Sequence, residues 1–161
     1  MPETKKTAVT DTSLPAADSN GVLDELIGYA LKRAHVHMNR KLVARLGQHD
    51  LRPAQFAALV MIEQAPGLTQ VDLGSQLSID PPQVVTLVNK LEKMGLALRI
   101  RSKPDRRAYG IYLSKSGEQL LKQLKTDARE VDIDGTASLD EGERAQLLAL
   151  LKKLYRSDTN D

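Results

Sequence analysis

A cluster of basic side chains in the middle of the chain has the clearest chemical meaning. Residues 99–107 carry five basic side chains against one acidic residue, Asp105, so this stretch has a net charge of +4. The basic residues are Arg99, Arg101, Lys103, Arg106 and Arg107. Such a run is often only a solvated loop, but arginine and lysine are also the side chains that bind DNA phosphates and enter its minor groove. The elements around the cluster decide between these two interpretations.

The sequence around the cluster predicts a helix followed by a hairpin. Asp80 precedes Pro81, a pairing typical of a helix start, and Gly95 is a suitable helix end. Between them apolar residues recur at helical spacing, which leaves a polar face on the other side. That face holds Gln83, Thr86, Asn89, Lys90 and Lys93. The alternating run 97–101 and the return of the chain over 106–113 predict the two strands of the hairpin.

Another helix, predicted over 69–77, precedes the polar-faced helix, and only Ser78 and Ile79 join the two. Helix, tight turn, helix and basic hairpin together predict a winged helix-turn-helix. The second helix of that motif enters the major groove and the hairpin tip reaches the minor groove. Glutamine and asparagine suit two-point contact with adenine, whereas Asp105 would hold an arginine because phosphates repel a carboxylate. The residues expected to contact DNA are Gln83, Thr86, Asn89, Lys90, Lys103, Arg106 and Arg107.

The overall composition indicates a globular protein that is not an enzyme. The 161 residues are 41% hydrophobic and 27% charged, and the core must be aliphatic because Phe56 is the one phenylalanine. Cysteine is absent, which excludes disulfides, thiolate catalysis and cysteine-ligated zinc. The sequence contains no nucleophile–base pair, no glycine-rich phosphate loop and no apolar run of membrane-spanning length. We therefore expect a cytoplasmic protein without a cofactor.

Long amphipathic segments flank the predicted winged helix. The apolar stripe over 22–46 predicts a helix too long for one small lobe to cover, since each residue adds about 1.5 Å. Further helices are predicted over 53–64 and 116–131, with a break at 132–135 and a capping box at 138–141 before a final helix. Leucine stripes at both ends of the chain predict an interface shared between two subunits.

These patterns define a domain organisation. Residues 1–19 lack periodicity and are predicted to be a flexible tail, and 20–161 form a single domain. Within it, 20–48 and 116–157 are the expected dimerisation helices, and 52–115 is the DNA-binding lobe. The predicted fold class is mainly α, a winged helix-turn-helix with a two-stranded β wing and terminal helices that form a dimerisation region.

A row of polar side chains on the first helix could bind a ligand. The row has spacings of four, four and three residues, which place its members on one side of a helix. Together with two residues near the start of the second helix, the candidate ligand residues are Tyr29, Arg33, His37, Arg40, Arg52 and Phe56. The arginines suit a carboxylate or phosphate, although a solvated polar edge explains the row equally well. His35 and His37 diverge on a helix, so no metal site is expected.

Three parts of the sequence resemble the MarR family. Asp105-Arg106-Arg107, followed after five residues by Leu113-Ser114-Lys115-Ser116-Gly117, is similar to that family's wing signature, D-x-R-x(5)-L-[ST]-x-x-G. Leu51-Arg52-Pro53-Ala54-Gln55-Phe56 and Gly67-Leu68-Thr69-Gln70, with Leu73, lie where the family has its second and third helices. The likeness extends over about 22–155. Arg52 departs from the helix-capping Ser or Thr that is more usual there.

The resemblance implies a homodimeric, ligand-responsive transcription factor in which Arg107 is the wing residue that reaches the minor groove. The first helix and the 51–56 stretch look like the branch that controls hydroxycinnamate breakdown and senses aromatic acyl-CoA thioesters. The implied function is a repressor of aromatic-acid catabolism, released from a pseudo-palindromic operator by such a thioester. A free aromatic carboxylate or phenolic effector is the alternative, and a winged-helix protein-interaction module is a second.

Overall fold

The structure is a computed structural model, which describes residues 21–101 and 109–156. Two compact units make up the chain, Met1–Ala34 and His35–Asp161. The tail predicted over 1–19 lies outside the described residues. The same holds for the predicted wing-tip residues Lys103, Asp105, Arg106 and Arg107.

The first unit contains a 3₁₀ helix, η1 (Gly21–Glu25), and the beginning of α1 (Ile27–Gly47). The backbone N–H of Leu26 donates to the carbonyl of Leu23 at 3.2 Å, which is the tighter 3₁₀ pattern of bonding. The prediction of one continuous helix from residue 22 is therefore wrong in its first turn. Apolar residues keep helical spacing through both segments, so periodicity does not separate them.

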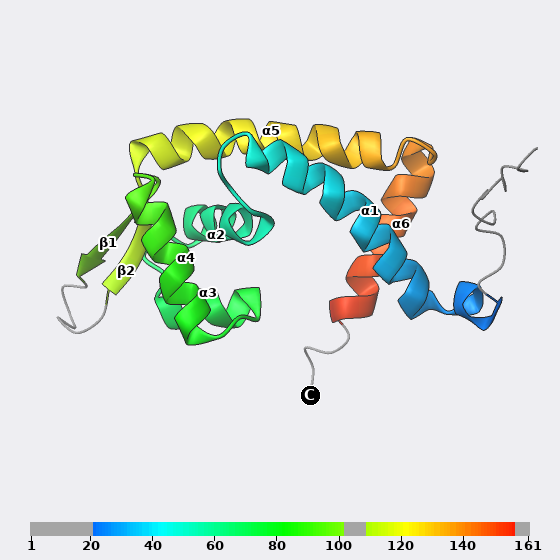
Figure 1. Cartoon of the computed structure of the whole chain (residues 1–161), viewed down its shortest axis with the longest axis horizontal. Helices are drawn as coiled ribbons and strands as arrows, with labels where there is room; N and C mark the ends of the chain where they lie inside the picture. Colours follow the sequence, from blue (N-terminus) through cyan, green and yellow to red (C-terminus); the bar gives the residue numbers. More distant parts are fainter. Residues whose placement is uncertain (1–20, 102–108, 157–161) are drawn as a thin grey trace, which may run out of the picture. The chain divides into compact units, whose positions relative to one another are not determined.

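The second unit contains the rest of α1 and a lobe of helices beside one hairpin (Figure 1). Its elements are α2 (Pro53–Gln64), α3 (Gln70–Leu77), α4 (Pro81–Lys93), β1 (Ala97–Arg101), β2 (Tyr109–Leu113), α5 (Lys115–Gly135) and α6 (Glu141–Arg156). The bounds predicted for α2 and β1 are confirmed. The hairpin strands pair antiparallel, with Ala97 opposite Leu113 and Arg101 opposite Tyr109. The predicted class, a mainly α winged helix-turn-helix, is confirmed.

Aliphatic side chains form the core of the lobe, as predicted. α2 packs against α3, α4, α5 and β2, and Figure 1 shows it between α5 and the α3–α4 pair. The largest fully buried side chains are Leu46, Leu59, Ile62, Leu73, Val84, Val88, Leu91, Ile111, Leu121 and Leu124. Among the described residues, no helix combines the length and the apolar character needed to cross a membrane.

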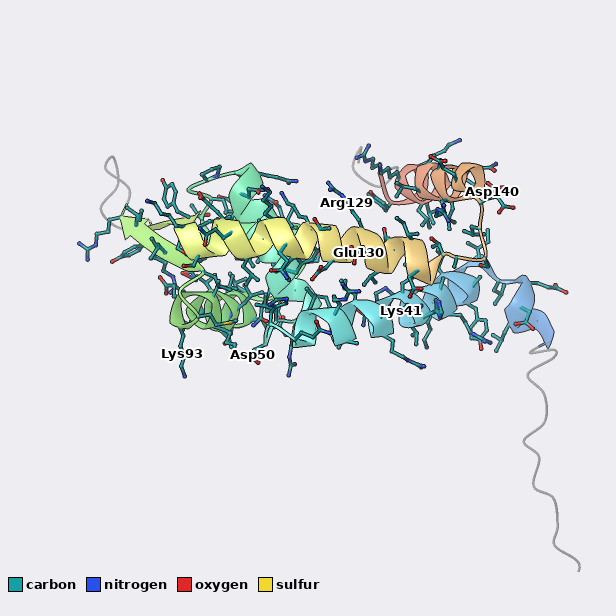
Figure 2. All side chains as sticks on the ribbon, turned by 90° about the horizontal axis from the view of Figure 1, so that it is seen from above. Lys41, Asp50, Lys93, Arg129, Glu130 and Asp140 are labelled. Carbon is teal, nitrogen blue, oxygen red and sulfur yellow. The ribbon has the colours of Figure 1, made fainter. Side chains whose placement is uncertain are left out.

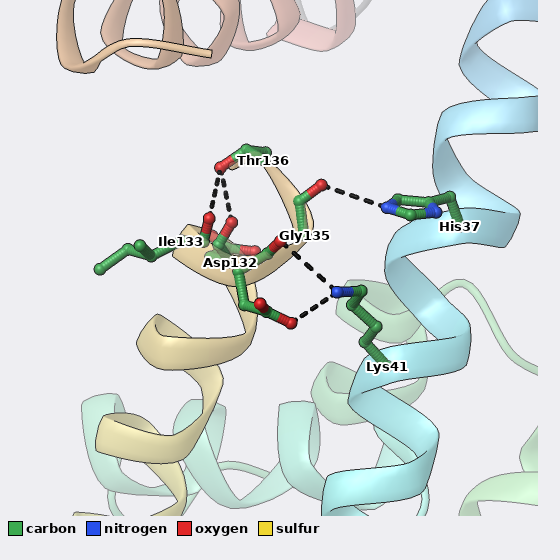
Figure 3. Close-up of polar contacts among 7 residues, drawn as sticks. His37, Lys41, Asp132, Ile133, Gly135 and Thr136 are labelled. Atoms are coloured by element: carbon green, nitrogen blue, oxygen red, sulfur yellow. Dashed lines mark hydrogen bonds and ion pairs between the residues drawn. The ribbon is translucent and has the colours of Figure 1, made fainter. Parts of the chain in front are cut away.

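α5 is longer than its sequence predicts. The predicted end at 131 and the break at 132–135 are wrong, because the helix continues to Gly135. Two side chains of α1 bind its last turn: Lys41 contacts the Asp134 carboxylate at 2.5 Å, and Nε2 of His37 donates to the Gly135 carbonyl at 3.2 Å (Figure 3). These long-range contacts satisfy groups at the helix end, a contribution that local sequence does not reveal.

The cap of α6 also differs from its prediction. The capping box forms two residues later than 138–141, between Asp140 and Glu143. The Glu143 N–H donates to the Asp140 carboxylate, and the Asp140 N–H donates to the Glu143 carboxylate, each at 2.9 Å. Both arrangements place an acidic side chain three residues after an oxygen-bearing cap, so the sequence offers two alternatives.

Gly117 explains the last position of the wing signature. Ser114 caps α5 by accepting the N–H of Gly117 at 3.0 Å, and its hydroxyl donates to the Gly95 carbonyl at 2.5 Å. A Cβ at Gly117 would lie 2.0 Å from the carbonyl oxygen of Leu96. The close approach of α5 to the chain before β1 therefore requires glycine.

We expect Gly117→Ala to lower the free energy of unfolding by about 1–3 kcal/mol, or more if the backbone yields poorly, because the added methyl overlaps a backbone oxygen. Urea denaturation followed by circular dichroism measures the change. Gly47→Ala is the matched control, since a Cβ there meets nothing within 4 Å. Equal stability of the two variants would contradict the packing described for α5.

Candidate nucleic-acid interface and ligand cavities

Hydrophobic burial fixes which face of α4 is exposed. One side of the helix packs into the lobe through Val84, Leu87, Val88 and Leu91. The polar residues predicted to read DNA lie on the other side: Gln83, Thr86 and Asn89 are exposed and Lys90 is half-buried. Lys93, near the end of the helix, is exposed and projects away from the ribbon (Figure 2). The structure thus brings the predicted residues of α4 to one polar face.

The first two residues of this face also bond within α4 and its cap. The side-chain oxygen of Gln83 accepts the backbone N–H of Asp80 at 3.3 Å, as in a capping box. The Thr86 hydroxyl donates to the Pro82 carbonyl at 2.9 Å. These bonds leave the amide nitrogen of Gln83 and the lone pairs of Thr86 available for other partners.

The remaining two residues bond to neighbouring elements. Lys90 forms an ion pair with Asp50, and this hydrogen bond and the lysine charge hold the pKa of Asp50 below its ordinary value. The side-chain oxygen of Asn89 accepts a hydrogen bond from Nη1 of Arg99 at 2.8 Å. The exposed face of α4 is therefore connected to the loop after α1 and to the wing.

The base of the wing has its charged side turned inward. Arg99 on β1 is 17% exposed, whereas Leu98 and Ile100 on the opposite side of the strand are about half exposed, at 49% and 50%. Arg101 is exposed; its guanidinium lies 5.5 Å from the centroid of the Tyr109 ring, and its Nε donates to the Tyr109 hydroxyl at 2.9 Å. Sequence reasoning gave Arg99 no role apart from the basic cluster.

A first cavity, of about 350 Å³, lies among α1, α2 and α5. Its lining includes His35, Asn39 and Leu42 from α1, Phe56 from α2, and Arg129 and Val131 from α5. Phe56 is the predicted ligand residue found here. Asn39 and Arg129 were missed, because α5 was considered only as an interface helix and no spacing pattern links residues so far apart.

A second cavity, of about 930 Å³, lies among the end of α1, the start of α2 and α4. Arg52, predicted to bind a phosphate, contributes to its lining, and so does Gln55. The side chain of Gln55 accepts the backbone N–H of Arg52 at 2.8 Å, which is one of the two hydrogen bonds of a capping box. From α4 the lining includes Gln83, Thr86 and Lys90. A residue predicted to bind ligand and residues predicted to contact DNA therefore line the same cavity.

The polar row of the first helix is less convergent than its spacing suggested. In the first unit, the Arg33 guanidinium lies 5.9 Å from the centroid of the Tyr29 ring. In the second unit, His37 bonds to Gly135, and Arg40 is exposed. Neither His37 nor Arg40 belongs to the lining of the two cavities described above.

Comparison with known proteins agrees with this architecture. Residues 51–109 match the MarR family. The transcriptional regulatory protein for the hcr operon of Thauera aromatica is 32% identical over 134 residues, which span 83% of this chain and 81% of that protein. The chain is also similar to the transcriptional repressor CouR. CouR bound to a 23-mer DNA duplex superposes with a TM-score of 0.78 and 33% identity, covering 84% of this chain and 96% of CouR.

A second structure of CouR, bound to p-coumaroyl-CoA, gives a TM-score of 0.75 with 31% identity, and it covers 86% of this chain and 97% of CouR. These relatives are transcriptional regulators and not enzymes, which also favours DNA binding over the protein-interaction alternative. The exposed polar face of α4, the hairpin beside it and these relationships lead to one conclusion: the chain belongs to the MarR family and is a DNA-binding transcriptional repressor.

Proposed function

We propose that this cytoplasmic repressor binds a pseudo-palindromic operator as a homodimer and leaves it when an aromatic acyl-CoA thioester, of the hydroxycinnamoyl type, binds. Its regulated genes then belong to aromatic-acid catabolism. The observation that carries the proposal is the second cavity, in which Arg52 shares a wall with Gln83, Thr86 and Lys90 of α4. A phosphate-bearing ligand there occupies the surface that DNA needs.

The chemistry of the second cavity suits the nucleotide part of such a ligand. Its volume of about 930 Å³ is at the upper end of the range typical of small-molecule sites. Arginine binds phosphate through two parallel N–H groups. Lys90 would add a second cation once its ion pair with Asp50, which also lines the cavity, opens. Bound phosphates would repel the DNA backbone and cover α4. Release by direct competition therefore supplements a change in the spacing of the two recognition helices.

The first cavity suits the aromatic acyl group. Phe56, Leu42 and Val131 supply apolar contact, and Asn39 and His35 supply polar groups for a ring hydroxyl. The two cavities use adjacent residues of the same helices, Leu42 and Val43 on α1 and Gln55 and Phe56 on α2. The solved complex of CouR with p-coumaroyl-CoA supports this class of effector.

A free aromatic carboxylate or phenolic compound is the alternative effector. The first cavity alone, at about 350 Å³, is large enough for one aromatic ring, and Arg129 would pair with a carboxylate. In that case the second cavity would remain part of the DNA surface, and Arg52 would have no role in the response.

The proposed homodimer would use the predicted segments 20–48 and 116–157. None of the residues of α6 is buried, although the helix carries Leu147, Leu148 and Tyr155, whose exposed fractions are 41%, 53% and 62%. A leucine-rich face of this kind requires a partner in solution. A second copy of the chain would satisfy it and would set the distance between the two α4 helices.

We expect p-coumaroyl-CoA, but neither p-coumarate nor CoA, to release the protein from its own upstream DNA, as measured by fluorescence anisotropy. Arg52→Gln should bind the DNA but require about tenfold more thioester, because a charged hydrogen bond to phosphate is lost. Arg40→Gln, which removes the same charge from α1, should respond normally. Release by p-coumarate with an unaltered Arg52→Gln response would instead support the free-acid alternative.

Asp50 is expected to weaken DNA binding, because it holds Lys90 and places a negative charge beside α4. Asp50→Asn should tighten operator binding and steepen its salt dependence by about one unit, since one more cation becomes available for phosphate. Because the pKa of Asp50 lies below its ordinary value, the carboxylate is ionised throughout the range from about pH 6 to 8, and the effect should be constant there. Glu63→Gln, which frees Lys125 instead, is the control and should change neither property.

The proposed minor-groove contacts of Lys103, Arg106 and Arg107 are tested most directly at Arg107. We expect Arg107→Ala to weaken operator binding about tenfold and to reduce the salt slope by about one unit. Titration of labelled operator at several salt concentrations measures both. Binding with unchanged affinity would refute the assignment of this arginine to the groove.

A further inference from the structure

Arg99 joins the wing to the two helices of the helix-turn-helix. Its Nε donates to the side-chain oxygen of Gln70 on α3 at 3.2 Å, and its Nη1 donates to that of Asn89 on α4 at 2.8 Å. Nη1 also contacts the carboxylate of Glu92, and the Arg99 backbone N–H donates to the same carboxylate at 3.0 Å. One side chain of β1 is thus bonded to both α3 and α4.

The environment of Arg99 is unsuited to direct DNA contact. The side chain is only 17% exposed, and the Glu92 carboxylate balances its charge. Arg101, two residues along the same side of the strand, is exposed and contacts the Tyr109 ring. A phosphate contact would require Arg99 to give up its ion pair with Glu92. We therefore expect Arg99 to act through the residues that it binds.

The hydrogen bond from Arg99 determines which group of the Asn89 amide faces outward, toward DNA. A guanidinium has only donors, so the oxygen of the Asn89 amide must face Arg99 and the nitrogen must face the other way. Two-point recognition of adenine uses both the oxygen and the nitrogen of one amide. With its oxygen turned toward Arg99, exposed Asn89 presents N–H donors. Guanine offers such donors two acceptors, N7 and O6, and thymine offers O4, whereas adenine offers N7 beside an amino group that is itself a donor.

We infer that Arg99 is a positioning residue for DNA specificity. By orienting the Asn89 amide, it makes Asn89 a hydrogen-bond donor to guanine or thymine instead of a bidentate partner of adenine. The inference rests on the proposed placement of α4 in the major groove. It changes the preference expected from the residue type alone, because the internal hydrogen bond turns the amide oxygen toward Arg99 and away from the amino group of adenine.

Selection from a library of randomised operators tests the inference. The wild-type protein should enrich guanine or thymine at one position of each half-site, and Asn89→Ala should lose this preference with about tenfold weaker binding. Arg99→Gln should relax the same position, since the Asn89 amide is then free to turn. Arg101→Gln, which removes an equal charge from the same strand, is the control and should keep the preference.

Asn89→Asp tests the inference in a variant that keeps Arg99. Its carboxylate still accepts from Arg99, so the protein should keep its melting temperature, but it now presents an acceptor outward. The preference should move to cytosine or adenine, whose amino groups donate. Circular dichroism of each variant, Arg99→Gln included, establishes that it is folded.

The outcomes are distinct. Enrichment of adenine at the Asn89-dependent position, or a preference that survives both Asn89→Ala and Asn89→Asp, would overturn the inference. A salt slope that falls in Arg99→Gln as it does in Arg107→Ala would overturn it as well, because Arg99 would then be a phosphate contact. Failure of the wild-type protein to enrich any sequence would instead refute sequence-specific operator binding itself.

Discussion

The rotation of α4 about its own axis is the constraint on which the functional surface depends. Burial of its apolar side against the lobe fixes that rotation, and the close packing of α3 requires Gly74, where a Cβ would lie 2.8 Å from Cγ2 of Val84. Once the rotation is fixed, Gln83, Thr86 and Asn89 face outward together. An aliphatic core without polar partners therefore determines which polar groups are offered to DNA.

The proposed function gives the outward face of α4 two uses that compete. That face is the surface expected to read DNA, and its first residues also form a wall of the second cavity together with Arg52. A ligand in that cavity would need no long pathway to affect DNA binding, because the two proposed binding events require the same side chains. Asp50 would moderate both uses, since its ion pair neutralises Lys90, which lies on the exposed face of α4 and also lines the cavity.

Local patterns were sufficient for α2 and β1, whose bounds are decided by local contacts. α2 begins at Pro53 and ends at Gln64 as predicted, and β1 has its predicted bounds, because caps, proline and alternation act over a few residues. The extension of α5 depends on His37 and Lys41, almost a hundred residues away in the sequence. The cavities depend on three helices at once, which explains why Phe56 and Arg52 were identified but not assigned to separate cavities.

The inward direction of Arg99 could not be predicted from the sequence for a different reason. An alternating strand has two faces, and its pattern does not say which one is buried; the usual expectation is that leucine and isoleucine turn inward and arginine outward. Here the reverse holds, because Glu92, seven residues earlier at the end of α4, supplies both a counter-charge and an acceptor for the strand's backbone. The cost of half-burying a cation is offset by satisfying most of its donors. A basic residue in a DNA-binding wing can therefore contribute to recognition by orienting another side chain, without touching the nucleic acid.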